Sequence, residues 1–130
     1  MRSICFALFL LVLPVSAVPK QARLPNALMN AQSVYIVDKT HQHVPLEEAY
    51  RDFDSWKRFT IAKTKGTADV VVVLTAQFQA SDGPMIPWLT LSIYAPNNPN
   101  DALFKVTRMG VREGTRECIK ELKKRLEQQS

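Results

Sequence analysis

The alternation of apolar and polar residues predicts five strands in this chain. From Val70 to Phe78, the first half is apolar on both sides, which is typical of a strand buried on both faces near the centre of a sheet. From Trp88 to Tyr94, apolar residues alternate with Thr90 and Ser92, as in a strand with one face on the core. β-Branched and aromatic residues predict three more strands, and a segment rich in proline and asparagine predicts a tight turn. These strands are 33–38, 59–62 and 103–109, and the turn is 96–101.

A spacing of three and four between apolar residues predicts two amphipathic helices. The first begins at Pro45, and the second covers 113–128. The element order β-α-β-β-β-β-α predicts an α/β fold (an α+β sandwich), with a mixed sheet of about five strands and two helices packed on one face. The apolar stripe is Leu46, Ala49, Tyr50, Phe53 and Trp56 in the first helix, and Cys118 or Ile119, Leu122 and Leu126 in the second.

The first 17 residues have the pattern of a cleavable secretory signal peptide. Arg2 gives a positive start, an apolar run extends from Ile4 to Val15, and small residues lead to Ala17. That run is shorter than the roughly 20 residues needed to cross a bilayer as a helix; an uncleaved membrane anchor is the alternative. Cleavage after Ala17 predicts a periplasmic or secreted protein, with no transmembrane span, in which a tether at 18–32 precedes a single α/β domain at 33–130.

The net charge and the cysteine count limit which classes of partner and which covalent links we expect. The formal net charge of +5 falls to about +4 when Arg2 leaves with the signal peptide. This small and dispersed excess does not indicate a nucleic-acid partner, although it is compatible with an acidic one. Cys5 also leaves, so Cys118 is then the only thiol, no internal disulfide can form, and Cys118 is expected in the core. No cofactor motif is present, and we expect no cofactor.

Three local patterns, together with the element order, resemble a known family. They are Trp56-Lys57-Arg58-Phe59-Thr60-Ile61, then Ala68-Asp69 before the valine run that ends at Leu74, then a hairpin from Leu89 to Val106 followed by a basic helix. The chain resembles, over about 33–128, the small periplasmic α/β domains typified by the amino-terminal domain of TolB and by the curli-secretion lipoprotein. It departs from them where Thr75-Ala76-Gln77 replaces a glycine that often follows, and no propeller or pore-forming segment follows the domain. The resemblance implies a bacterial envelope setting and action by binding, and it offers no catalytic residues to transfer.

Candidate chemistry is centred on the two histidines. His41 and His43 in an extended loop can point the same way and hold a divalent metal, with Asp38 as a third ligand. The alternative is an ordinary polar loop between a strand and a helix. A hydrolase would need a nucleophile beside a base, and no serine lies in a nucleophile-elbow motif. The carboxylates of Asp52 and Asp54 are predicted on different faces of their helix, where they are poor acid–base partners.

Two surfaces are candidates for partner binding. Met85, Ile86 and Trp88 are large apolar residues at the end of a predicted loop, 80–87, where they either contact a partner or fold back over the core. The last helix is basic and either docks to anionic lipid or an acidic partner, or is simply a solvated face diluted by glutamates. Its cations are Arg112, Arg116, Lys120, Lys123, Lys124 and Arg125.

Together these patterns predict an exported, non-catalytic binding or accessory module. The expected partner is an unknown envelope protein or an anionic surface. The alternative is a small metal-dependent or hydrolytic enzyme centred on His41 and His43.

Overall fold

The computed structural model describes residues 23–79, 83 and 85–129, and the predicted signal peptide lies outside them. Its five-stranded mixed sheet has the order β2-β1-β3-β4-β5, with β1 parallel to β2 and β3 and the remaining pairs antiparallel. The predicted fold class is therefore confirmed, and β3 lies at the centre of the sheet as expected. The strands are β1 (Ser33–Asp38), β2 (Thr60–Ile61), β3 (Val70–Gln79), β4 (Ile86–Ala95) and β5 (Asn98–Met109).

The core lies on one face of the sheet, where alternate residues of the central strands point. Leu74 of β3 is paired with Leu91 of β4, Val72 is paired with Ile93, and all four side chains are at most 1% exposed. Because side chains alternate along a strand, the intervening residues point to the opposite face. The predicted alternation in β4 is confirmed.

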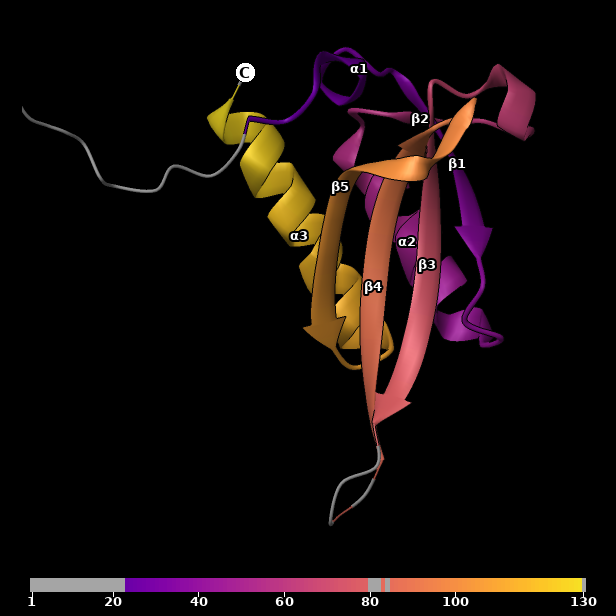
Figure 1. Cartoon of the computed structure of the whole chain (residues 1–130), viewed down its shortest axis with the longest axis vertical. Helices are drawn as coiled ribbons and strands as arrows, with labels where there is room; N and C mark the ends of the chain where they lie inside the picture. The colour runs from indigo at the N-terminus through magenta and orange to yellow at the C-terminus, as the bar shows by residue number, and fades with distance from the viewer. Residues whose placement is uncertain (1–22, 80–82, 84, 130) are drawn as a thin grey trace, which may run out of the picture.

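Two long helices cover the core face of the sheet and contact each other (Figure 1). They are α2 (His43–Trp56) and α3 (Arg112–Gln128). The apolar stripe of α2 differs from the prediction: Tyr50 is 41% exposed, whereas Glu48 is buried at 1%. Since α3 packs beside α2, the buried side of α2 is turned toward α3 as well as toward the sheet.

Part of the segment predicted as a tether packs on the domain. A short helix, α1 (Asn26–Met29), places Leu28 in the core, and Leu24 and Ala31 are buried with it. The backbone N–H of Leu24 donates to Oε1 of Gln129 at 2.7 Å, which joins this segment to the end of α3. Among the described residues, the domain therefore begins before residue 33.

The ends of the sheet differ from the sequence expectation. β4 already begins at Ile86, so Ile86 and Pro87 belong to a strand and not to the predicted loop. β5 begins at Asn98, within the segment predicted as a turn, because Ala95 pairs with Asn98 across a two-residue connection. A 3-10 turn (Lys65–Thr67) joins β2 to β3. In the part of the chain that the structure describes, no helix is both long and apolar enough to cross a membrane.

Close packing at Gly114 fixes the start of α3 against the sheet. A Cβ atom at this position would lie 3.0 Å from the carbonyl oxygen of Arg108 and 3.1 Å from Cβ of Leu89. Only glycine lets the helix approach β4 and β5 this closely without displacing backbone. Gly110, at a φ of 99°, makes the turn from β5 into the helix.

Candidate functional site

Large apolar side chains are exposed together at the far end of the β3–β4 hairpin and the adjoining end of β5. Met85 is 59% exposed, Met109 55%, Phe78 45% and Ile86 37%. Strand pairing places them around the same end of the sheet, with Phe78 opposite Pro87 on the helix-facing side and Met109 opposite Trp88 on the other side. We call Phe78, Met85, Ile86, Trp88 and Met109 the apolar tip. Among the described residues, Tyr50 on α2 is the remaining large apolar side chain with comparable exposure.

The geometry of the hairpin explains why the apolar tip is not covered. Figure 1 shows the end of β3 and β4 extending beyond the two helices that cover the rest of the sheet. Phe78 lies on the helix-facing side of β3 by alternation from Leu74, yet it is still exposed. Of the three residues singled out in the sequence, Met85 and Ile86 are exposed, whereas Trp88 is half-buried. Partner binding by these residues stays a prediction.

The two histidines lie on a turn before α2, and both are exposed. His41 has a φ of 63°, and His43 is the first residue of the helix. The carboxylate of Asp38 accepts hydrogen bonds from the backbone N–H and the hydroxyl of Thr40, so it holds the turn. The described residues contain no group of three histidine, cysteine, aspartate or glutamate side chains placed to hold a metal ion.

Several cations of α3 are engaged by acidic or aromatic groups. Nζ of Lys120 lies 3.4 Å from Glu117 on the same helix. Nζ of Lys123 lies 6.0 Å from the centre of the Trp56 ring, within the range of a cation–π interaction. Much of the positive charge of α3 is therefore balanced by a nearby carboxylate or held against an aromatic ring. Docking of this helix to an anionic surface stays a prediction.

An ionic cluster around the buried carboxylate of Glu48 joins α2 to α3, with its two arginines partly exposed. Glu48 is 1% exposed, and its carboxylate lies 2.9 Å from the guanidinium of Arg51 and 3.6 Å from that of Arg116. Burial alone raises the pKa of Glu48, but a hydrogen bond with Asp52 and the charges of Arg116 and Arg51 lower it below its ordinary value. Glu48 therefore carries the negative charge of the cluster.

Asp52, one helical turn from Glu48, holds a proton more tightly than an ordinary aspartate. Burial, the hydrogen bond with Glu48 and the charge of Glu48 raise its pKa to about 6, against the opposing charges of Arg116 and Arg51. Its Oδ2 atom is buried and, as a carboxylate oxygen, has no hydrogen-bond partner among the described residues. A proton on Asp52 supplies the missing donor, because the carboxyl group can then donate to the carboxylate of Glu48.

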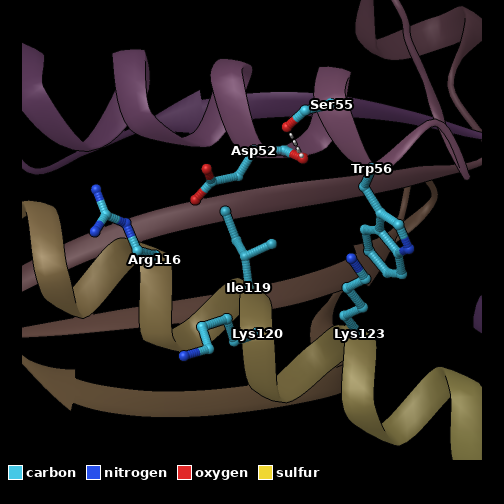
Figure 2. A pocket seen from close by; sticks show the side chains of 7 residues that line it. All are labelled: Asp52, Ser55, Trp56, Arg116, Ile119, Lys120 and Lys123. Carbon is cyan, nitrogen blue, oxygen red and sulfur yellow. Dashed lines mark hydrogen bonds between the residues drawn. The ribbon is translucent and has the colours of Figure 1, made fainter.

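A pocket of about 260 Å³ opens beside this cluster, between α2 and α3. Figure 2 shows Asp52 and Arg116 directed toward one another across the gap between the helices, and Lys123 reaching toward Trp56. Ser55 also lines the pocket, but its hydroxyl donates to the backbone carbonyl of Arg51 at 2.8 Å. Of the charged groups that line the pocket, Arg116 and Lys123 reach from α3 to α2, which is a structural role, whereas Lys120 pairs with Glu117 on its own helix.

The proton on Asp52 links stability to pH. Between its ordinary pKa of 3.8 and the folded value of about 6, the folded chain keeps a proton that the unfolded chain has released. This contribution to stability therefore falls as pH rises through that window. We expect Asp52→Asn, whose amide donates to Glu48 without a proton to lose, to match wild type near pH 4 and to be more stable near neutral pH.

Chemical denaturation of both proteins across this pH range measures the effect. Asp54→Asn, a neighbouring exposed aspartate, controls for the loss of one negative charge. An Asp52→Asn variant whose advantage over wild type does not grow with pH would show that Asp52 is ionised throughout.

Comparisons with known proteins do not assign the chain to a family. No family model matches it. No curated protein matches it either. Among solved structures, it is similar to an uncharacterized lipoprotein B from Nitrosomonas europaea, determined by solution NMR, with 11% identity and a TM-score of 0.44 over 82% of this chain and 79% of that one. A similarity at this level carries no argument about function. The resemblance to TolB and curli domains, and export itself, therefore stay predictions.

The Glu48–Asp52 pair is not among the predictions from the sequence, which compare Asp52 with Asp54. One signal was available, because Glu48 lies three residues after Pro45 and Asp52 three residues after Ala49, and the structure shows both Pro45 and Ala49 to be buried. Acidic residues at this spacing share the buried side of the helix. The partner, Arg116, lies on another helix and could not be identified from spacing.

Proposed function

We propose that this chain is an exported, non-catalytic binding or accessory module of the bacterial cell envelope, and that it binds a partner protein through the apolar tip. The observation that carries the proposal is the exposure of Phe78, Met85, Ile86 and Met109 at one end of the sheet. Large apolar side chains gathered on a surface commonly mark a protein–protein contact, and methionine and aromatic residues are enriched in such contacts.

The shape of the apolar tip suits insertion into a groove of the partner. Four of the five residues, Phe78, Ile86, Trp88 and Met109, are carried on paired strands, so their backbone is already ordered before binding, and Met85 directly precedes β4. Pro87, paired with Phe78, further restricts the backbone of β4 at this end. A preorganised surface loses less conformational entropy on association than a flexible one. The tip therefore binds as a rigid apolar wedge whose partner presents a complementary apolar groove.

The alternative, an enzyme centred on His41 and His43, gains no supporting observation. Three pockets are lined by described residues, and neither histidine lies in the wall of any of them. The third residue of that candidate site, Asp38, is engaged with Thr40. A chain that acts by binding needs only an exposed contact surface, and the apolar tip provides one.

A matched pair of variants tests the proposal. Met85→Asp and Tyr50→Asp each place a carboxylate at an exposed apolar position, one at the apolar tip and one on α2. Each should change the free energy of unfolding by less than about 1 kcal/mol, because the side chains are solvated. We expect affinity capture from an envelope extract to recover a defined protein with wild type and with Tyr50→Asp, and to lose it with Met85→Asp.

Ile86→Asp should behave like Met85→Asp in the same experiment. Trp88→Ala is a less suitable variant, because Trp88 is half-buried and its loss also removes packing. If Met85→Asp and Ile86→Asp recover the same proteins as wild type, the apolar tip is not the binding surface. If they melt far below Tyr50→Asp, the tip is instead part of the core.

A further inference from the structure

A second pocket lies on the face of the sheet opposite α2 and α3. Its volume is about 280 Å³, and its floor is formed by Val37 of β1 and by Val71 and Val73 of β3. These valines are paired in register, since Val37 faces Val73 across the parallel β1–β3 ladder. The size is just below the roughly 300–1,000 Å³ typical of small-molecule sites, so the pocket suits a small ligand.

The pocket forms because the end of the β4–β5 hairpin bends across this face of the sheet and adds a wall beside the valines. The register shifts at Ile93/Tyr94 and again at Tyr94/Ala95, and such irregularities bend a hairpin away from its sheet. Figure 1 shows this end of the hairpin bending across the sheet near the start of β3. Tyr94, Pro96 and Pro99 therefore form an apolar wall beside the valine floor.

Two lysines give this apolar pocket a positive rim. Both line the pocket from opposite ends of its floor, because Lys39 follows the end of β1, Lys65 lies in the 3-10 turn before the start of β3, and the two strands are parallel. No acidic residue is among the residues that line it, and no ion pair joins either lysine to another described residue. Thr75 adds a hydroxyl group at the Lys39 end, because Asp38, the residue before Lys39, is paired with Leu74. The pocket thus combines an apolar interior with cationic groups at its opening.

We propose that this pocket binds a small amphiphilic anion, a medium-chain alkyl carboxylate, with its chain on Val37, Val71 and Val73 and its head group on Lys39 and Thr75. The floor from Val71 to Thr75 extends about 13 Å at roughly 3.3 Å per residue, which matches a medium chain in length. Burying the chain supplies most of the affinity, because apolar area leaves water. Lys39 supplies selectivity for an anionic head group over a neutral one.

Sodium octanoate is the probe that tests the site. In the ¹⁵N-labelled protein, octanoate should shift the backbone amides of Val37, Val71, Val73 and Tyr94 with a saturable dependence on concentration. Acetate lacks the chain and should produce no saturable shift. Octanol lacks the charge and should bind about fivefold more weakly, the upper limit expected from one solvent-exposed charge pair.

A pair of double variants separates the rim from net charge. Lys39→Ala/Lys65→Ala should weaken octanoate binding by about fivefold, through the loss of the Lys39 charge. Lys120→Ala/Lys124→Ala removes the same charge from α3 and should leave octanoate binding unchanged. The proposal is overturned if octanoate gives no saturable shift at the pocket, or if both double variants lose affinity equally. It is also overturned if wild type binds phosphatidylglycerol vesicles but not free octanoate, since the ligand would then be a membrane surface.

Discussion

Replacing Leu74 with alanine is expected to lower the free energy of unfolding by about 2–5 kcal/mol. Leu74 is fully buried at the centre of the sheet, and its backbone is paired with Asp38 on one side and Leu91 on the other. Truncation removes apolar contacts and leaves a cavity that flanking strands cannot easily fill. Because a domain of this size has a total stability of roughly 5–15 kcal/mol, the variant should melt far below wild type.

Val73→Ala is the natural comparison, since Val73 is the next residue of β3 but is half-buried on the opposite face. It should destabilise the domain less than Leu74→Ala. If chemical denaturation showed that both variants lose the same free energy of unfolding, the two faces of β3 would be equally buried. An unchanged melting temperature for Leu74→Ala would contradict the central position of β3.

The second large effect is expected at the ionic cluster between α2 and α3. Arg51→Met/Arg116→Met removes both cations that lie within ion-pair distance of the buried Glu48 carboxylate. An uncompensated buried charge typically costs on the order of 3 kcal/mol or more, unless the carboxylate takes up a proton. We therefore expect a large loss of stability near neutral pH and a smaller loss near pH 4.

The double variant Lys120→Met/Lys124→Met removes the same net charge from exposed positions and serves as the control. It should have little effect at either pH, because surface ion pairs are worth about 0–1 kcal/mol. If the arginine variant is no less stable than this control, Glu48 does not depend on its two arginines. Chemical denaturation at the two pH values gives the answer directly.

The sheet was predictable because its strands bury residues at a regular period. Leu89, Leu91 and Ile93 are all at most 1% exposed, as their alternation indicates. The valine run from Val70 correctly predicts a central strand, although Val73, on the face opposite the helices, is only half-buried. Strand ends were less predictable: Asn98 looks like a turn residue, yet it pairs with Ala95 because the hairpin connection is tight.

Contacts between distant segments were not predictable from local pattern. Leu24 and Leu28 read as part of a tether rich in proline, but they are buried against the core formed by the rest of the domain. Glu48 reads as an exposed acidic residue near a helix start, but α3 covers it and supplies Arg116. In both cases the residues that cover these side chains are distant in the sequence. Local residue spacing therefore gives no information about the contact.

The candidate surface was found in part from sequence. Met85 and Ile86 stood out as large apolar residues beside a predicted loop, and both are exposed. Phe78 and Met109 join them only because β3, β4 and β5 are paired in a particular register. The pocket above the valines has the same origin, since the hairpin that forms its wall bends at irregularities that the sequence does not mark.

Site-specific photo-crosslinking tests most directly whether the apolar tip is the contact surface. A photoreactive phenylalanine analogue placed at Met85, and separately at Tyr50, samples the apolar tip and a matched exposed position on α2. In the envelope of the source organism, we expect irradiation to join the Met85 variant to one defined protein and the Tyr50 variant to none. Adducts that are absent at Met85, or that are identical at both positions, would contradict the proposal.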